Sequence, residues 1–514
     1  MSRDGQSQLF ELPSLHFWKI LALILAATTF ALSRWQPIYW EDVWIYLGTG
    51  RYILSHHMIP RGDVFSWSVA GARWVNTDWL YEVLLTVLVR GVGLFGVSLL
   101  KNLLVLLSLF FVDKRLRFWR AGAIERVFFL GLVFLGGWPF WVERADLSSL
   151  AFFSALLWTI DRSFLSPWGR SRWLLWIVLF AFWANLHGQF TFGLFVLAVY
   201  TVFQGLTDRY KARAIVAGTT LCAAATFINP YGAGLHLGIL RFMNSPVSDI
   251  YEWMPPRGLG FLFFDLSFGL VLVSYFIRRT YSSQVMYSAL LVLFLGYSAC
   301  WHQRFVHFFM VGAFPYAAVN WLESRPRAWL VKSTGAYEKW ALAVLCLVLL
   351  WISVSSAHAM RGGIDTKNSG YIEEACDFIE HWEIRGPFYN EYKFGAYWLY
   401  RFQGNPAEFQ DGRDSVVDGF DRVIRICAQA KSRPETWIGF LNHYGIEAAV
   451  IHHPLVPPEQ QFRVLDRFFP PSQWLAVYQD DLCVLLLRRH SKNERVIRAL
   501  ESGWLYRSRA HARR

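Results

Sequence analysis

Apolar segments recur along most of the chain, and they limit the choice of fold more than any other feature. Of the 514 residues, 54% are hydrophobic and 17% are charged, whereas soluble domains are usually about 25% charged. One soluble core cannot cover so much apolar surface, so a lipid bilayer is the expected solvent. We predict about eleven membrane-spanning segments of roughly 20 residues or fewer, near residues 17–33, 96–112, 126–141, 147–160, 173–186, 189–206, 213–229, 259–277, 284–300, 304–321 and 339–356.

The polar stretches between these segments alternate in charge. Five of them are rich in Arg and Lys, as is typical of cytoplasmic loops: residues 113–120, 161–172, 207–214, 277–284 and 324–339. A cytoplasmic N-terminus places all five inside the cell, and an odd number of spans then places the C-terminal region outside. The formal net charge of +12 is explained by these loops, so no nucleic acid is expected as a partner.

The first apolar segment, residues 17–33, has about the length of the apolar core of a signal peptide. The sequence that follows it, Ser33-Arg34-Trp35, does not resemble the small-x-small pattern of a cleavage site. We therefore expect this segment to be retained as the first span.

The stretch 34–91 is predicted to be a long external loop rich in Trp and Tyr, which favour the membrane–water boundary. Apolar residues at helical spacing in 43–54 predict an amphipathic helix lying on the membrane surface. Residues 65–75 alternate in polarity and turn at a glycine, which predicts a hairpin. A second interfacial helix is expected to follow Thr77 as its N-cap. If this helix were a true span, residues 113–120 would lie outside, against the charge rule.

The composition changes after about residue 357, and the pattern there indicates a small α/β domain. We predict a strand, turn and helix in 386–400, a strand running into a polar loop in 407–415, a helix and strand on either side of Gly445, and two strands joined at Asp480-Asp481. The predicted domains are 1–356 in the membrane, 357–490 outside it, and a basic tail, 491–514. The part of the tail with Arg507, Arg509, Arg513 and Arg514 is expected to be flexible.

Carboxylates at the external ends of spans are the first candidates for chemistry. Glu41, Asp42, Asp146 and Glu252 fall there, where an acid is costly unless it is paired or used. A carboxylate that is partly desolvated becomes more basic, which suits a general base acting on a hydroxyl. The alternatives are helix capping for Glu41 and Asp42, and a structural ion pair for Asp146 with its neighbour.

Cationic and aromatic side chains on the same side are the second group. Arg144 and Arg304 are candidates to hold a phosphate, because a guanidinium binds two oxygens at once. Trp253, His307 and His187 are further candidates for substrate contact, although the histidines can also be ordinary polar residues of a bundle.

Three other polar patterns point less clearly to chemistry. Asp411 and Arg413 are interpreted as an ion pair that closes a tight turn, in preference to a pair of substrate-binding residues. The adjacent pairs His56-His57 and His452-His453 are typical of solvated loops, and the six cysteines lack metal-binding spacing. We therefore predict no metal ligands.

Several stretches resemble the GT-C superfamily of polytopic glycosyltransferases, which includes protein O-mannosyltransferases and the aminoarabinose transferases of lipid A. They are residues 40–54, 59–85, 183–190, 229–232, 252–256 and 409–414. The resemblance implies a mostly α, polytopic membrane protein with juxtamembrane helices and a small extracytoplasmic α/β domain. It also implies a bacterial inner-membrane protein with a cytoplasmic N-terminus and a periplasmic C-terminal domain.

The resemblance further implies transfer of a sugar from a polyprenyl-phosphate donor to a glycan, lipid or protein acceptor. Asp42 takes the place of the base of the first loop, with Glu41 as its fallback, and Asp146 takes the place of the second acid. No cofactor is expected; Ala145 departs from the metal-binding motif of oligosaccharyltransferases, so dependence on a divalent cation such as Mg²⁺ stays open. Two alternatives also stay open, a transporter or flippase for a lipid-linked sugar and a non-catalytic protein of envelope assembly.

Overall fold

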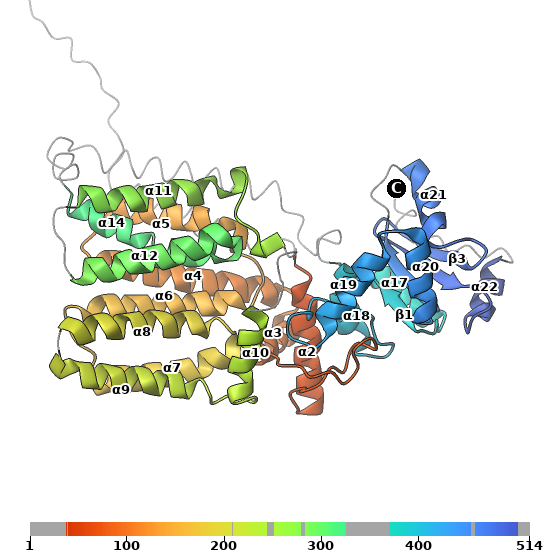
Figure 1. The fold of residues 1–514 in the computed structure, drawn as a ribbon, viewed down its shortest axis with the longest axis horizontal. Helices are drawn as coiled ribbons and strands as arrows, with labels where there is room; N and C mark the ends of the chain where they lie inside the picture. Colours follow the sequence, from red (N-terminus) through yellow and green to blue (C-terminus); the bar gives the residue numbers. More distant parts are fainter. Residues whose placement is uncertain are drawn as a thin grey trace, which may run out of the picture. The chain divides into compact units, whose positions relative to one another are not determined.

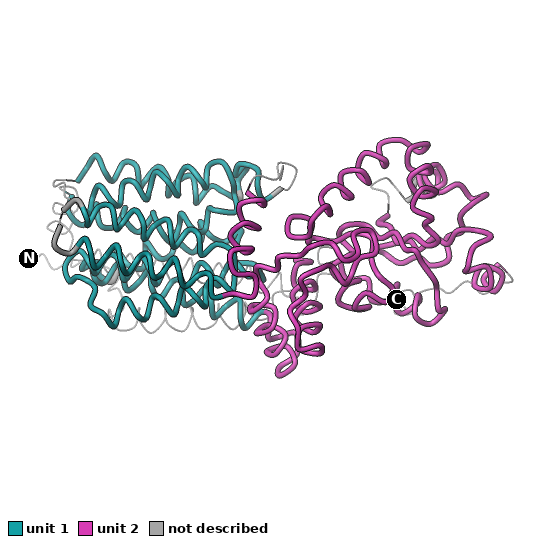
Figure 2. The backbone as a smooth tube through the Cα atoms, turned by 60° about the horizontal axis from the view of Figure 1, so that its bottom comes forward, with its two compact units in different colours: residues 1–37, 98–228, 246–362 teal, residues 38–97, 229–245, 363–514 magenta. Residues whose placement is uncertain are grey.

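A computed structural model describes residues 38, 40–207, 209–243, 251–278, 283–324, 370–453 and 458–501. The chain forms two compact units, each built from separate stretches of sequence (Figure 2). We call residues 1–37, 98–228 and 246–362 the helical unit. Residues 38–97, 229–245 and 363–514 form the mixed unit.

The helical unit is a bundle of helices that run alongside one another (Figure 1). Its longer helices are α4 (Phe95–Phe118), α5 (Ala123–Gly137), α6 (Asp146–Ser163), α7 (Arg170–Leu186), α8 (Phe190–Thr207), α9 (Arg209–Ala225), α11 (Leu262–Ile277) and α12 (Ser283–Trp301). Shorter elements are η1 (Trp138–Phe140), η2 (Tyr251–Trp253), η3 (Leu259–Phe261), η4 (Gln303–Phe305), α13 (Val306–Gly312) and α14 (Pro315–Leu322). Helix α6 lies in the core, since most of its side chains are buried.

Among the residues that the structure describes, three helical segments are long and apolar enough to cross a membrane: Phe95–Phe118, Gln284–Trp301 and Gln303–Leu322. Four shorter apolar helices are Phe190–Gly205, Ala212–Ala225, Ala233–Met243 and Leu262–Ile277. The predicted first and last spans, 17–33 and 339–356, lie outside the described residues. The mostly helical class is confirmed, and the count of eleven spans stays a prediction.

The segment Gln303–Leu322 is broken where α13 ends and α14 begins at Pro315. Proline has no N–H, so the carbonyl of Val311 loses its normal helical donor. Arg115 of α4 replaces it, because its Nη1 donates to the Val311 oxygen over 2.8 Å. Both Nη atoms also donate to the Gly312 oxygen over 3.2 Å. A buried guanidinium thus satisfies the backbone at the break.

The mixed unit contains a four-stranded sheet in the order β1-β2-β4-β3. Its strands are β1 (Phe388–Asn390), β2 (Ala448–His452), β3 (Trp474–Gln479) and β4 (Cys483–Arg488). Strand β1 pairs parallel to β2, with Phe388 opposite Ala448, and the other two pairings are antiparallel. The helices are α2 (Asp42–His56), α3 (Trp79–Val92), α10 (Ala233–Met243), α17 (Glu373–His381), α18 (Tyr392–Phe402), α19 (Phe420–Ala430), α20 (Pro434–His443), α21 (Pro458–Phe468) and α22 (Glu494–Glu501).

Most local predictions for the mixed unit agree with these elements. The strand and helix in 386–400, the strands 474–479 and 483–488, and the helix and strand on either side of Gly445 are present. Gly445 has φ +58, a conformation that glycine adopts without steric cost. The helix predicted in 43–54 is α2, and its placement on the membrane surface stays a prediction.

Three local predictions are wrong. The two arms of the hairpin predicted in 65–75 do not pair with each other: Arg73 bridges to Gly62, which precedes this stretch, and Ser66 bridges to Glu408. The strand predicted in 407–415 is reduced to that single bridge. The N-cap of α3 is Asp78 and not Thr77, whose hydroxyl donates to Asp78 Oδ1 over 2.8 Å.

The predicted basic tail begins with a helix, α22, whose Val496, Ile497 and Leu500 are buried. Apolar residues at this spacing lie on one helical face. Residues 494–501 therefore pack as a helix, and the part of the tail that was predicted to be flexible, with Arg507, Arg509, Arg513 and Arg514, lies outside the described residues.

Candidate functional site

The helical unit brings Arg144 and Glu252 together, although they are 108 residues apart. Arg144 Nη1 donates to Glu252 Oε1 in a partly buried ion pair. Burial raises the pKa of the Glu252 carboxyl, but the charges of Arg144 and Arg304 outweigh burial and hold it below its ordinary value. Arg144 therefore pairs with a carboxylate of another loop.

Arg304 lies close to the same loop through Trp253. Its guanidinium carbon is 4.7 Å from the centre of the Trp253 ring, a cation–π contact. His302 Nδ1 lies 2.7 Å from the Trp253 carbonyl oxygen, and the Gln303 N–H donates to the Met254 oxygen over 2.9 Å. The loop 252–254 and the short helix η4 are thus held against each other, and two arginines meet at Glu252 and Trp253.

Asp146 begins α6 and is nearly buried. A carboxylate in the first turn of a helix is favoured by the partial positive charge of the exposed N–H groups. Its Oδ2 lies 3.6 Å from His307 Nε2. Asp146 Oδ1, His307 Nδ1 and Gln189 Oε1 are buried and have no hydrogen-bond partner among the described residues. Buried polar atoms are normally bonded to protein or water, so these atoms are available to a polar ligand or to water.

His187 joins this group through α6. Its Nδ1 lies 3.1 Å from Ser149 Oγ, and Ser149 follows Asp146 by one turn on the same face. The Gln189 N–H donates to His187 Nδ1 over 3.3 Å, and Trp183 Nε1 donates to Ser149 Oγ over 2.8 Å. These bonds fix the ring at the end of α7.

Contacts within the helical unit place the seven predicted residues that it carries in three sets. Arg144 pairs with Glu252, and Arg304 lies on the ring of the next residue, Trp253. Asp146 lies beside His307, and His187 contacts the same helix, α6, through Ser149. Sequence reasoning placed them on one side of the membrane by the charge of the loops. It did not predict which of them pair.

The mixed unit holds the other two predicted residues, Glu41 and Asp42, at the start of α2. Glu41 is the N-cap residue, but its side chain makes no capping hydrogen bond. A Cβ atom added to Gly412 would lie 3.6 Å from Asp42 Oδ1 and 3.6 Å from Tyr392 Oη. The loop around Gly412 thus packs against Asp42.

This loop adds a further carboxyl group, Asp414, that sequence reasoning did not single out. Burial, and to a lesser degree the charges of Asp411, Asp42 and Asp421, raise the pKa of Asp414 to about 7. Burial and the nearby carboxylates also raise the pKa of Tyr392 well above its ordinary value. Asp42 therefore shares its surroundings with a carboxyl group that titrates near neutral pH.

The conformation of the Gly412 loop is fixed by Arg413, which is buried. Its Nη1 donates to Asp63 Oδ1 over 2.7 Å, and its Nη2 donates to Glu408 Oε1 over 2.9 Å. Its Nε donates to Asp411 Oδ2 over 2.8 Å, and its backbone N–H donates to Asp411 Oδ1 over the same distance. The predicted tight turn with an Asp411–Arg413 ion pair is present, and two more carboxylates join it.

Solved structures of known proteins resemble most of the chain. ArnT from Cupriavidus metallidurans bound to undecaprenyl phosphate has a TM-score of 0.55 and 13% identity over 93% of this chain and 99% of ArnT. The oligosaccharyltransferase AglB from Archaeoglobus fulgidus, in complex with an inhibitory peptide and a dolichol-phosphate, has a TM-score of 0.59 and 10% identity over 85% of this chain and 69% of AglB. The chain has the GT-C fold. No family model and no curated protein matches the sequence.

The GT-C resemblance predicted from short stretches such as residues 40–54 and 252–256 is therefore confirmed. An identity of 10% to 15% supports a shared fold and carries no residue roles. The roles of single residues are argued below from their own chemistry.

Two further features were missed by sequence reasoning. Lys101 of α4 pairs with Glu143 over 2.6 Å, and both are buried. Asp63 and Glu408 bind Arg413, from which they are separated by 350 and 5 residues. Each carboxylate stood in a polar stretch that gave no signal of its distant partner.

The adjacent histidine pairs, 56–57 and 452–453, contact nearby side chains and backbone. His56 stacks on Tyr52 at 4.1 Å, and His453 Nε2 lies 2.6 Å from the Asp480 carbonyl oxygen. Within the described ranges, no group of three or more His, Cys, Asp or Glu side chains is arranged to hold a metal ion.

Proposed function

We propose that this protein is a membrane glycosyltransferase that moves a sugar from a polyprenyl-phosphate donor to an extracytoplasmic acceptor. The observation that carries the proposal is the likeness to ArnT bound to undecaprenyl phosphate, which extends over 93% of the chain. We further propose that the protein lies in the inner membrane with its N-terminus in the cytoplasm and the α/β part of the mixed unit in the periplasm.

The arginines of the helical unit support this proposal. A phosphate leaving group gains negative charge as its bond to the sugar breaks, and fixed cations that meet this charge lower the barrier. Arg304 lies on the face of Trp253 at 4.7 Å, and Arg144 holds Glu252. We assign both arginines to the lipid phosphate, which would compete with Glu252 for the Arg144 guanidinium. Trp253 and His307 are proposed as further substrate contacts, because Trp253 packs against Arg304 and His307 lies beside Asp146.

Asp42 is assigned the role of general base. It would take the proton of an acceptor hydroxyl, and the acceptor oxygen would then attack the anomeric carbon. The bond from that carbon to the phosphate oxygen would break, the electron pair would leave with polyprenyl phosphate, and the configuration at the sugar would invert. Asp42 is partly buried at the start of α2, and partial desolvation makes a carboxylate a stronger base.

Asp146 is assigned the role of second acid, with Glu41 as a fallback for Asp42. The buried atoms Asp146 Oδ1 and His307 Nδ1 have no hydrogen-bond partner among the described residues, so a hydroxyl of the donor sugar has an acceptor and a ring nitrogen to bind. His187, held by Ser149, supports the same face of α6.

Mass spectrometry of envelope lipids and glycans tests this function. Cells that lack the protein should lose one sugar modification and retain its polyprenyl-phosphate donor. The wild-type protein should restore the modification, whereas Asp42→Asn with Glu41→Gln should not. If the double variant restores it fully, the protein is not an enzyme of this mechanism, and a transporter or an assembly role would then explain the phenotype.

A further inference from the structure

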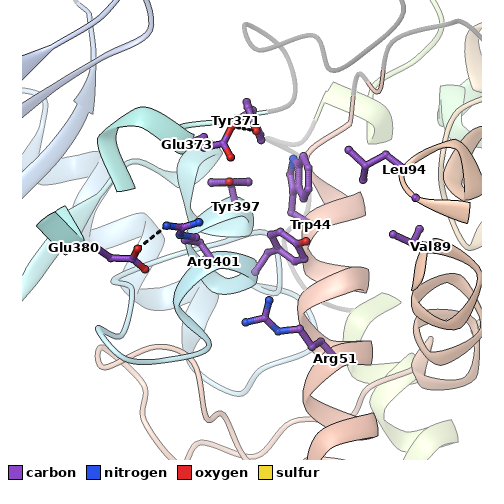
Figure 3. A pocket seen from close by; sticks show the side chains of 11 residues that line it. Trp44, Arg51, Val89, Leu94, Tyr371, Glu373, Glu380, Tyr397 and Arg401 are labelled. Carbon is purple, nitrogen blue, oxygen red and sulfur yellow. Dashed lines mark hydrogen bonds and ion pairs between the residues drawn. The ribbon is translucent and has the colours of Figure 1, made fainter. Parts of the chain in front are cut away.

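The mixed unit contains a second feature, a pocket of about 610 Å³ that involves neither Asp42 nor Arg413 (Figure 3). It is lined by side chains of α2, α3, α17 and α18 and by residues beside them. Its volume falls in the range of small-molecule pockets, about 300–1,000 Å³. The function proposed above makes no use of this pocket.

Aromatic rings form one side of the pocket. Trp44 stacks on Tyr371 at 5.6 Å, meets Tyr397 edge-on at 5.0 Å and lies 5.1 Å from Tyr400. Trp44 and Tyr397 are buried, whereas Tyr371 and Tyr400 are partly exposed. The two buried rings therefore hold the two partly exposed rings in fixed orientations.

Charged side chains of both signs face the same space (Figure 3). Arg401 Nη2 binds Glu380 Oε2 over 2.5 Å and Asp377 Oδ1 over 2.8 Å. The Tyr371 hydroxyl donates to Glu373. Arg401 is thus neutralised by its partners, while its neighbours offer carboxylate oxygens as acceptors.

Arg51 is the cation that is open to a ligand. Its guanidinium lies 5.5 Å from the centre of the Tyr400 ring, and no carboxylate among the described residues forms an ion pair with it. A guanidinium presents several N–H donors in one plane. Arg51 therefore offers paired donors directly beside an aromatic face.

A ligand of this pocket has to pack on aromatic rings, donate hydrogen bonds to carboxylates and accept hydrogen bonds from Arg51. Few classes of ligand do all three. A sugar ring has a face of C–H groups that packs on aromatic rings, and its edge of hydroxyls both donates and accepts hydrogen bonds. A lipid tail would leave Arg51 and the carboxylates buried without partners, which is costly. We propose that this pocket binds a sugar ring of a glycan, through Tyr371, Tyr400 and Arg51.

The pocket is separate from the proposed base. Trp44 and Arg51 are seven residues apart on α2, so they lie on one face of the helix. Asp42 points away from that face by about 180–200° at 100° per residue. The sugar ring that binds in this pocket is therefore a part of the glycan that does not take part in the reaction at Asp42. Sugar binding goes beyond the proposed function, and only the assignment of this glycan as the acceptor rests on that function.

Glycan binding by the full chain in lipid nanodiscs tests the proposal. The probe is a printed array of bacterial surface glycans and simple oligosaccharides, followed by titration of the best-bound soluble one. We expect Arg51→Ala and Tyr400→Ala each to weaken binding at least tenfold, whereas Tyr400→Phe, which keeps the ring, should stay within about threefold of wild type. Arg425→Ala, an exposed arginine of α19 outside the pocket, is the matched control.

The melting temperature of each variant separates lost binding from lost folding. If wild type binds no glycan, or if folded Arg51→Ala and Tyr400→Ala variants bind as well as wild type, the pocket is not a sugar site. Asp42→Asn should keep glycan binding while it loses sugar transfer. The two hypotheses therefore have separate readouts. If the pocket binds no glycan, the measurement of sugar transfer still tests the proposed function. If the protein transfers no sugar, the glycan-binding measurement still tests the pocket.

Discussion

Among the described residues, each unit buries one arginine, and the two arginines are neutralised in different ways. Arg115 in the helical unit faces one carboxylate, Asp161, over 2.7 Å, and spends its other donors on the carbonyls of Val311 and Gly312. The Tyr316 hydroxyl donates to the second Asp161 oxygen over 2.8 Å. One positive and one negative charge thus balance in the core of the bundle.

Arg413 in the mixed unit faces three carboxylates, those of Asp63, Glu408 and Asp411. One cation cannot balance three buried anions, so a proton is expected to make up part of the difference. Burial raises the pKa of Glu408 well above its ordinary value, and the charge of Asp411 raises it further. The bundle uses backbone carbonyls to complete its arginine site, whereas the mixed unit uses an excess of carboxyl groups.

Removal of Arg413 should have the largest effect. Arg413→Met leaves three carboxylates buried without a cation, and we expect a loss of about 5 kcal/mol in unfolding free energy. A large fall in melting temperature and in yield would show it. Neutralising all three acids together (Asp63→Asn, Glu408→Gln, Asp411→Asn) in the same variant should recover more than half of the loss. An unchanged melting temperature in Arg413→Met would refute the role of the cluster.

Removal of Arg115 should cost less, about 3 kcal/mol, because a single carboxylate is left unpaired. Here one companion change, Asp161→Asn, should recover most of the loss in melting temperature. The recovery should stay incomplete, since the carbonyls of Val311 and Gly312 still lack a donor. If Asp161→Asn gives no recovery, the charge balance described for the bundle is wrong.

A smaller effect is expected at Asp414, which extends the comparison to the surroundings of Asp42. Its folded-state pKa is about 7, against 3.8 for an ordinary aspartate. A raised pKa gives stability that is present at low pH and is lost as pH rises towards and through 7. The unfolding free energy of Asp414→Asn relative to that of wild type should therefore rise between pH 5 and pH 8. The expected rise is on the order of 2 kcal/mol after allowing for the partial exposure of Asp414. Melting temperatures measured across this range test the sign. An equal difference at both pH values would contradict the raised pKa.

The smallest effect is expected where an ion pair is exposed. Arg425 and Asp421 of α19 pair over 2.8 Å, one turn apart and open to solvent. Arg425→Ala should cost only about 0.3–0.5 kcal/mol, since water already solvates both charges. The same melting assay provides the baseline for the two buried arginines. A loss comparable to that of Arg115→Met would mean that burial does not set the scale.

Local patterns predicted much of the fold. The helix α2 and the strands β2 and β4 followed from apolar spacing, and Gly445 marked the turn before β2. The predicted hairpin in 65–75 failed because Ser66 bridges to Glu408, 342 residues away. Alternating polarity indicates an extended chain, but it does not say which segment supplies the partner strand.

For the candidate residues, the sequence predicted the location of several side chains but not most of their partners. Loop charge placed Arg144, Asp146 and Arg304 on one side of the membrane, and short-range spacing suggested the Asp411–Arg413 turn. The pairing of Arg144 with Glu252 and the binding of Asp63 by Arg413 depend on packing between distant segments. A single sequence carries no signal for such pairs, since each partner stands in an ordinary polar stretch.

Release of polyprenyl phosphate from a polyprenyl-phosphate-sugar donor, by the purified full chain in nanodiscs with acceptor present, tests the central claim most directly. The account predicts release together with transfer for wild type, and a loss of at least 100-fold for Asp42→Asn, the usual scale for a lost general base, with the melting temperature unchanged. Undiminished transfer by Asp42→Asn with Glu41→Gln, in a folded protein, would contradict the account.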